Sequence, residues 1–366
     1  MSLRQFLIAC LLLALAGCSN ESAAPDVDKL LDEKFSHYNE GDQPGVAVML
    51  VRDGEVRVQK SYGLANVATR SLITADTAFR LASVSKQFAA MAILILQEDG
   101  ALSLDDPVSK YVPELAPYGG VTIRQLLVHT GGLPDYYDNI DTSAGMPTNH
   151  DAAVLLGKMA SPEFAPGDRY AYSNAGYDML GPVVEAAASM PFAQFVQERI
   201  FDVLGMHGSL VHDHTLPQVA NRAIGYDVVA DVVELNDADP LNGIVGSGGV
   251  YSTLNDLYRW DQALDGERLV SRESLALMFS TGATNSGEQL NYGLGWNLNE
   301  FAGHARQDHT GSWVGFRAYI GRIPKLHATI VMLANRGDID LRTHAEEIMS
   351  AWLQLETPPG RIPAAT

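Results

Sequence analysis

The sequence predicts an α/β (α+β) fold in which one antiparallel sheet is built from both ends of the chain. Residues 45–62 contain two strand patterns around Asp53-Gly54, a dipeptide typical of a two-residue hairpin turn. Strand patterns return only after about residue 240, and the stretch between them is mostly helical with long loops. The economical architecture is therefore a sheet flanked by helices, with a helical subdomain inserted into it.

The first half of the chain supplies helices around this hairpin. Residues 27–38 have the pattern of an amphipathic helix. Residues 87–97 (QFAAMAILILQ) form a strongly apolar run, which predicts a buried helix that ends at Gly100. Thr122 and Gln125 have the spacing of a capping box at the start of a short helix. Further helices are expected at 178–189, at 192–204, at 255–264 with Asn255 as a plausible cap, and at 343–353.

The C-terminal part contains the remaining strand patterns. Strands are expected at 292–298, 313–322 and 327–335. In the second of these, every other residue is apolar, which is the period of a strand: Val314, Phe316, Ala318 and Ile320. One domain is thus expected over 27–356. Its sheet subdomain is assigned to about 27–75 and 241–356, and its helical subdomain to about 76–240.

Residues 1–17 have the features of an export signal. The apolar run 6–16 follows Arg4 and is too short for a stable bilayer anchor. It ends in small residues before Cys18, which resembles a bacterial lipoprotein signal; an ordinary cleaved secretory signal is the alternative. The resemblance implies lipidation of Cys18, a tether over 18–26 and an exported protein held in the bacterial cell envelope. Ser19, in place of Asp, favours the outer membrane, facing the periplasm.

Composition excludes several functions. The only cysteines are Cys10 and Cys18, so the chain after residue 18 can form no internal disulfide, no thiolate metal site and no cysteine nucleophile. A net charge of −19 argues against nucleic-acid binding. A polar stretch contains three histidines but no matching carboxylate element, so neither a metal nor a cofactor is expected: His207, His212 and His214.

Ser83 and Lys86 are the candidate nucleophile and its base. Residues three apart share a helix face, so the Lys86 amine can lie beside the Ser83 hydroxyl. Free backbone N–H groups at the start of the buried helix could stabilise an oxyanion. The alternative is that Ser83 only caps that helix, with Ser85 as a second cap candidate.

Two later segments qualify as partners of this pair. Tyr172-Ser173-Asn174 follows a Pro-Gly turn, and His309-Thr310-Gly311 stands immediately before the expected strand at 313–322. Each has a similar triplet elsewhere in the chain, Tyr137-Asp138-Asn139 for the first and His129-Thr130-Gly131 for the second. His129 ends the capped helix and is interpreted as a residue that orders a loop. Tyr137 follows that helix and could line the cleft, but it is a poor candidate for proton transfer.

With these elements the chain resembles the serine β-lactamase and DD-peptidase family, whose motifs are S-x-x-K, Y-x-N and K-T-G. The Tyr form of the second motif resembles class C β-lactamases and the related D-Ala-D-Ala carboxypeptidases and esterases. The resemblance covers almost all of the chain after Cys18. Other family-like stretches are RQLLVHTGGLP at 124–134, YSNAGY at 172–177, IFDVLGM at 200–206, GGVYSTLNDL at 248–257 and LANR at 333–336.

The resemblance implies a role for each site residue. Lys86 and Tyr172 would take the proton from Ser83, and the Lys86 ammonium would favour the Tyr172 phenolate. Backbone N–H groups of Ser83 and Ser312 would hold the oxyanion. Substrate binding is assigned to Asn174, His309, Thr310, Gly311 and Ser312. His309 departs from the commonest pattern, which has Lys, so attraction for a substrate carboxylate is expected to be weaker, or to depend on pH near ~6.5.

The sequence thus predicts a serine hydrolase that acts on an amide or ester through an acyl-Ser83 intermediate. A D-amino-acid peptide, as for a DD-carboxypeptidase, or a small ester ranks first, and a β-lactam is the alternative. The expected partners are this peptide or small-molecule substrate and a membrane reached through the lipid anchor. A metallohydrolase and a non-catalytic penicillin-binding-like scaffold are the rival classes.

Overall fold

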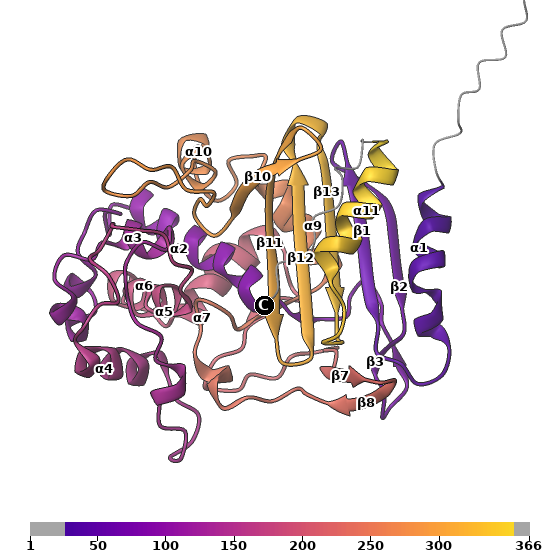
Figure 1. The fold of residues 1–366 in the computed structure, drawn as a ribbon, viewed down its shortest axis with the longest axis horizontal. Coiled ribbons are helices and arrows are strands. Elements are labelled where there is room, and N and C mark those ends of the chain that lie inside the picture. Colours follow the sequence, from indigo (N-terminus) through magenta and orange to yellow (C-terminus); the bar gives the residue numbers. More distant parts are fainter. Residues whose placement is uncertain (1–25, 355–366) are drawn as a thin grey trace, which may run out of the picture.

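The computed structural model describes residues 26–354. Its main sheet has six strands in the order β10-β11-β12-β13-β1-β2, and all neighbours are antiparallel (Figure 1). Strands from the two ends of the chain meet at its centre, where β1 pairs with β13. This confirms the predicted sheet. The strands are β1 Val46–Arg52, β2 Glu55–Tyr62, β10 Asn297–Phe301, β11 His304–Trp313, β12 Phe316–Ile323 and β13 Ala328–Ala334.

Both faces of the sheet are covered. Helices α1 (Val27–Phe35) and α11 (Leu341–Leu353) pack on one face, at the right of Figure 1. Strand β1 shows why its sequence is apolar without a break. Val46, Val48 and Leu50 face α1 and α11, whereas the alternate residues, such as Met49, belong to the larger core on the other face. A strand buried on both faces needs apolar residues at every position.

The hairpin between β1 and β2 turns as its sequence predicts. Both Asp53 (φ 54°) and Gly54 (φ 75°) have left-handed backbone conformations. A two-residue turn of this kind matches the twist of the flanking strands, and Asp-Gly tolerates it well.

Helix α2 (Lys86–Glu98) is the central helix of the larger core. Every residue from Lys86 to Leu96 is buried, as its apolar run predicts. Helix α3 begins with the expected capping box, in which Thr122 and Gln125 exchange two hydrogen bonds. The remaining helices are α3 Ile123–Leu127, α4 Asn149–Met159, α5 Asn174–Asp178, α6 Leu180–Ala188, α7 Phe192–Val196, α8 Asp202–Leu204, α9 Leu254–Ala263 and α10 Arg272–Met278.

Short strands link these helices to the main sheet. A three-stranded sheet in the order β5-β9-β6 leads directly into the turn that contains Ser83. The short strands are β3 Leu64–Asn66, β4 Ser71–Leu72, β5 Phe79–Arg80, β6 Leu210–Val211, β7 Tyr226–Val229, β8 Val232–Leu235 and β9 Val250–Ser252.

Three sequence expectations are wrong in detail. The strand expected at 292–298 begins only at Asn297, as β10. His309, Thr310 and Gly311 lie inside β11 rather than before a strand. The alternation of apolar and polar residues did not reveal this strand, because Arg306 and Asp308 are buried as an ion pair and charged residues therefore occupy interior positions. Helix α9 is capped by Thr253 rather than by Asn255, because the Thr253 hydroxyl accepts the backbone N–H of Asp256 at 3.1 Å.

Asn335 joins four segments at the end of β13. Its Oδ1 accepts the backbone N–H of Gly45 at 2.8 Å. Its Nδ2 donates to the carbonyls of Leu64, Ala65 and Ile224 at 2.9–3.2 Å. Replacing this buried side chain would leave several backbone groups without partners.

We therefore predict that Asn335→Ala lowers the free energy of unfolding by about 2–4 kcal/mol. Asn291→Ala is the matched control, because Asn291 is exposed; it should change stability by less than about 0.5 kcal/mol. Denaturant titration of both variants measures the difference. Equal stabilities would show that the Asn335 hydrogen bonds contribute little.

Candidate active site

Ser83 lies in a single helical turn, Ala82–Ser85, immediately before α2. The preceding residue, Ala82, has a left-handed backbone (φ 47°), which is strained for a residue with a Cβ atom. Neither Ser83 nor Ser85 caps α2 through its side chain. Ser85 instead accepts the backbone N–H of Val250 at 3.1 Å. The interpretation of Ser83 as a mere helix cap is therefore wrong.

Lys86 is completely buried, and its ammonium donates three hydrogen bonds. The acceptors are Ser83 Oγ at 3.1 Å, Asn174 Oδ1 at 2.8 Å and the carbonyl of Ser247 at 3.0 Å. Burial lowers the pKa of Lys86 to about 7, although the negative charge of Asp178 opposes this shift. Near neutral pH a substantial fraction of Lys86 is thus an uncharged amine within reach of the Ser83 hydroxyl.

Tyr172 and Asn174 approach this pair from the start of α5. Ser173 caps α5 by accepting the N–H of Gly176 at 3.1 Å, which places its two neighbours on either side of the cap. The Tyr172 ring centre lies 4.9 Å from Lys86 Nζ. Tyr172 is partly exposed, yet partial burial raises its pKa, and the neighbouring Ser83 side chain only partly offsets this shift. The expected phenolate is therefore wrong, and the hydroxyl keeps its proton at neutral pH.

Strand β11 passes the nucleophile turn on its other side. Strand β10 pairs with β11 only as far as Asp308, so the edge from His309 onward has no strand partner on that side. At Gly311 a Cβ atom would lie 2.1 Å from the carbonyl oxygen of Leu81, so only glycine allows the strand to approach this closely. Ser312, one residue further, lines the same cleft as Ser83. Thr310 is exposed between His309 and Gly311.

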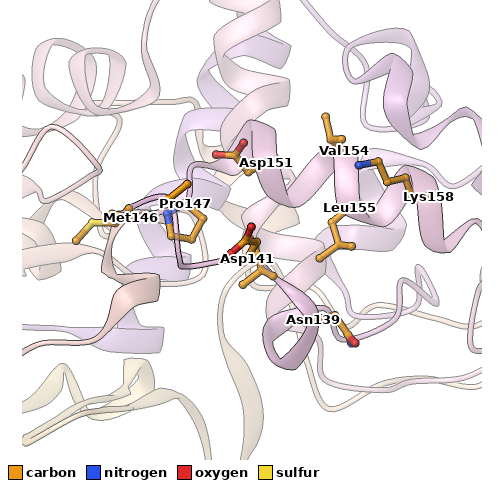
Figure 2. A pocket seen from close by; sticks show the side chains of 11 residues that line it. Asn139, Asp141, Met146, Pro147, Asp151, Val154, Leu155 and Lys158 are labelled. Carbon is orange, nitrogen blue, oxygen red and sulfur yellow. The ribbon is translucent and has the colours of Figure 1, made fainter.

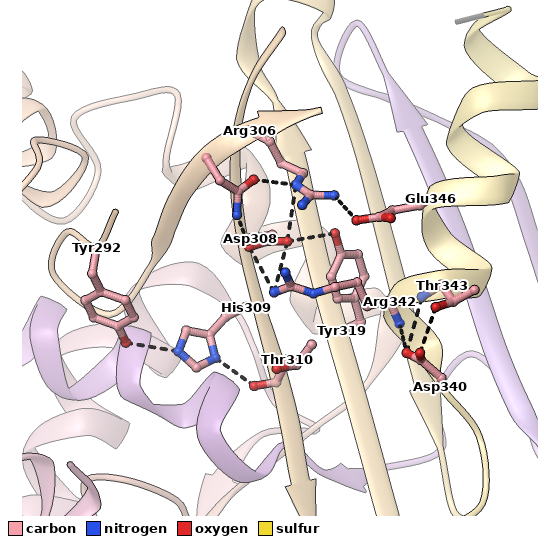
Figure 3. Close-up of polar contacts among 11 residues, drawn as sticks. Tyr292, Arg306, Asp308, His309, Thr310, Tyr319, Asp340, Arg342, Thr343 and Glu346 are labelled. Carbon is pink, nitrogen blue, oxygen red and sulfur yellow. Dashed lines mark hydrogen bonds and ion pairs between the residues drawn. The ribbon is translucent and has the colours of Figure 1, made fainter. Parts of the chain in front are cut away.

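His309 is buried between its hydrogen-bond partners (Figure 3). Nδ1 lies 2.6 Å from the carbonyl of Thr310, which requires a proton on Nδ1. Nε2 is then an acceptor for the Tyr292 hydroxyl at 2.9 Å. Burial, aided by the charge of Lys86, lowers the pKa of His309 to about 3. The expected titration near ~6.5 is therefore wrong, and His309 is neutral across the physiological range.

His129 orders the loop that carries Tyr172, as its sequence position suggested. Its Nδ1 accepts the backbone N–H of Ser173 at 3.0 Å, and its carbonyl accepts that of Ala171 at 2.9 Å. Its ring also packs against Tyr172, with ring centres 4.3 Å apart. These contacts confirm the interpretation of His129 as a loop-ordering residue.

Asp178 is a site residue that sequence reasoning missed. It is completely buried and accepts hydrogen bonds from the hydroxyls of Tyr136 (2.8 Å) and Tyr137 (3.0 Å). It also accepts the backbone N–H of Ser247, whose carbonyl binds Lys86. Burial raises the pKa of Asp178, and the positive charge of Lys86 counteracts this shift. The sequence signal that could have identified Asp178 was the presence of a carboxylate within an otherwise apolar helical stretch.

A narrow cleft opens over Ser83. Its walls come from several elements, and Tyr137 is among them, as expected. The lining residues are Arg80, Ala82, Ser83, Tyr137, Asn174, Leu241, Ile244, Ser247, Gly248, Ser312 and Trp313.

A wider pocket of about 370 Å³ lies beside α4 (Figure 2). Apolar side chains, including Met146 and Leu155, share its wall with Asp141, Asp151 and Lys158. It contains neither Ser83 nor a hydrogen-bond partner of Lys86. The narrow cleft is therefore the candidate active site, because it alone of the two is lined by a nucleophile, Ser83, that is hydrogen-bonded to a base, Lys86.

The sequence expectations about metal binding and about the membrane can be compared with the structure only over the described residues. Among residues 26–354, no group of three or more His, Cys, Asp or Glu side chains is arranged to hold a metal ion. In the same range no single helix is long and apolar enough to cross a membrane; only the pair 174–188 and 192–204, bent by 79°, meets that requirement jointly. The predicted signal and Cys18 lie outside the described residues.

Comparison with known proteins identifies the family of the chain. The family model described as Beta-lactamase matches residues 31–351. A penicillin-binding protein of Bacillus subtilis is 34% identical over 325 residues, which are 84% of this chain and 72% of that protein. A D-aminopeptidase of Brucella anthropi is 30% identical over 75% of this chain, which spans only 52% of that longer protein.

A solved structure extends the likeness to the fold. The D-amino acid amidase of Ochrobactrum anthropi, in complex with L-phenylalanine amide, has a TM-score of 0.77 and 25% identity, covering 90% of this chain and 99% of its own. The chain therefore belongs to the beta-lactamase family and is a serine hydrolase of the β-lactamase/DD-peptidase type.

Proposed function

We propose that this protein hydrolyses an amide or ester of a D-amino acid through an acyl-Ser83 intermediate. One observation carries the proposal: a completely buried amine, Lys86, lies 3.1 Å from the Ser83 hydroxyl. With a pKa of about 7, Lys86 can accept the proton of Ser83 without help from a phenolate.

The reaction follows from this arrangement. Neutral Lys86 takes the proton as Ser83 Oγ attacks the substrate carbonyl, and the backbone N–H groups of Ser83 and Ser312 stabilise the oxyanion. The Tyr172 hydroxyl protonates the leaving amine or alcohol and recovers its proton from the Lys86 ammonium. A water molecule then attacks the acyl carbon, and its proton passes through Lys86 to the departing Ser83 oxygen. Asn174 orients both Lys86 and the substrate.

The substrate class is supported by the relatives. Both the D-aminopeptidase and the D-amino acid amidase are named for substrates with a D-amino acid. A β-lactam is the second candidate, favoured by the penicillin-binding relative. A neutral His309 disfavours it, because a cation is missing from the β11 edge where the family pattern has Lys. A non-catalytic scaffold would not need the buried amine beside Ser83.

The nucleophile is tested by chemical labelling. A fluorophosphonate should modify Ser83 alone, because no other serine has the Lys86 amine within 3.1 Å of its hydroxyl among the described residues. Peptide mapping by mass spectrometry locates the adduct. Ser83→Ala should lower turnover of a D-amino acid amide by at least about 10³-fold while leaving thermal unfolding unchanged. An adduct on Ser85 or Ser173 would overturn the assignment.

The base is tested by the pH dependence of kcat/KM. Lys86 must be neutral to accept a proton, so the rate should rise with pH and level off above about 7. The groups facing Lys86 are Asp178, Tyr172, Tyr177, His129 and His309. Of these, Asp178 is the one whose charge raises the pKa of Lys86.

Asp178→Asn should therefore move the midpoint of this profile down by about 1 pH unit or more. Tyr137→Phe is the matched control: it removes one hydrogen bond to Asp178 but no charge, so the midpoint should stay in place. An unchanged midpoint in Asp178→Asn would mean that Lys86 does not set the profile.

We also propose that Cys18 is lipidated and holds the protein in the outer membrane, facing the periplasm. The support is the apolar run of 6–16 followed by small residues and a cysteine. The full-length protein expressed in a bacterium should incorporate radiolabelled palmitate, and Cys18→Ser should lose the label. A soluble, unlabelled protein would indicate an ordinary secretory signal instead.

A further inference from the structure

Arg80 is a buried cation that lacks a counter-ion in the part of the chain that the structure describes. Only 3% of it is exposed, and its Nε and Nη1 atoms are buried without a hydrogen-bond partner. Three other buried arginines each pair with a carboxylate: Arg306 with Asp308, Arg322 with Asp261 and Arg336 with Asp338. A buried charge without a partner is costly, so this exception needs a reason.

The Tyr251 ring does not meet this need. It lies 5.7 Å from the Arg80 guanidinium carbon and stabilises its charge, but a ring offers no lone pair to the N–H donors in the guanidinium plane. Arg222 gives the comparison, because it lies 5.3 Å from the same ring and is paired with Asp237. Arg80 alone of the two is left with unused donors.

The position of Arg80 is fixed and close to the chemistry. Its backbone pairs with Tyr251 between β5 and β9, three residues before Ser83. Its side chain lines the cleft that contains Ser83, together with Tyr137 and Ser312. Strand β5 thus holds Arg80 in the wall of the candidate active site, with Nε and Nη1 covered by neighbouring groups. The remaining guanidinium nitrogen, Nη2, is not one of these covered donors, and it is the donor through which Arg80 would meet a substrate carboxylate.

The cleft also indicates which part of the substrate meets Arg80. Tyr172, the proposed proton donor to the leaving group, lines a neighbouring hollow with Phe164, and this hollow meets the cleft at Asn174. The leaving group must lie near its proton donor. The Arg80 side of Ser83 is then left for the acyl part, which stays attached to the serine.

We propose that Arg80 binds a carboxylate on the acyl part of the substrate and so determines specificity for anionic acyl groups. This rests on the proposed acyl-Ser83 chemistry. It places the cation for substrate recognition at β5, whereas His309 on the β11 edge is neutral.

The test compares two esters that differ in one group, the para-nitrophenyl monoester of glutaric acid and para-nitrophenyl pentanoate. The wild type should prefer the glutarate ester, and added salt should weaken that preference. Arg80→Gln should lower kcat/KM for the glutarate ester roughly 10- to 100-fold, mainly through KM, and change the pentanoate ester by less than about threefold. Arg80→Lys should recover part of the loss.

Arg222→Gln is the matched control, because Arg222 contacts the same ring but does not line the cleft. It should leave the ratio of the two esters unchanged. Equal losses for both esters in Arg80→Gln, or a wild type with no preference, would overturn the proposal.

Binding without turnover separates this proposal from the proposed function. Titration calorimetry of Ser83→Ala, with and without Arg80→Gln, measures affinity for the intact glutarate ester. If Arg80→Gln weakens binding to Ser83→Ala, and the wild type is found to form no acyl-enzyme, the carboxylate site is supported and the hydrolase chemistry is rejected. If Ser83→Ala binds the ester equally well with and without Arg80→Gln, the carboxylate site is rejected, whatever the turnover of the wild type.

Discussion

Burial of the Lys86 ammonium is the constraint on which the rest of the site depends. Taking an ammonium out of water costs several kcal/mol, and the cost is tolerable only when its donors are matched and a counter-charge is near. Each donor of Lys86 meets an acceptor from a different segment: Ser83 before α2, Asn174 at the start of α5 and Ser247 in the turn before β9. The site therefore forms only when these three segments are packed together.

Asp178 supplies the counter-charge without touching Lys86 directly. The two side chains are linked through Ser247, whose N–H binds the carboxylate and whose carbonyl binds the amine. This spacing matters, because a direct ion pair would hold Lys86 in its charged form. Burial, opposed by the more distant charge of Asp178, instead gives Lys86 a pKa of about 7. At this pKa the side chain is neither always charged nor always neutral near physiological pH.

Strand β11 is held in place by buried ion pairs and a hydrogen bond around Asp308. Asp308 is completely buried and binds Arg306, Arg342 and the Tyr319 hydroxyl (Figure 3). Glu346 on α11 pairs with Arg306, so the network joins β11, β12 and the C-terminal helix. These contacts begin one residue before His309. They fix the register of the strand whose open edge faces the nucleophile, because breaking a buried charge pair is costly.

Which features could be predicted from the sequence depends on how far apart along the chain the interacting residues lie. The hairpin at Asp53-Gly54 and the Ser83–Lys86 spacing are local, and both were predictable from adjacent residues. The strand at His309 was misplaced because its buried charges, Arg306 and Asp308, are neutralised by partners on other elements. Asp178 was missed for the same reason, since its partners are distant in sequence and no local pattern connects them.

The protonation states could not be predicted from residue types either. From its ordinary pKa, His309 was expected to titrate near neutrality, and the positive charge of Lys86 was expected to favour the Tyr172 phenolate. Burial overrules both, because desolvation acts against the charged form of every group in the cleft and acts on His309, Tyr172 and Lys86 together. Of these three groups, Lys86 is the one whose pKa lies near neutral pH. With a neutral His309 at the β11 edge, the buried Arg80 is a cation of the same cleft that has no counter-ion among the described residues, and in the proposed reaction the substrate carboxylate is that counter-ion.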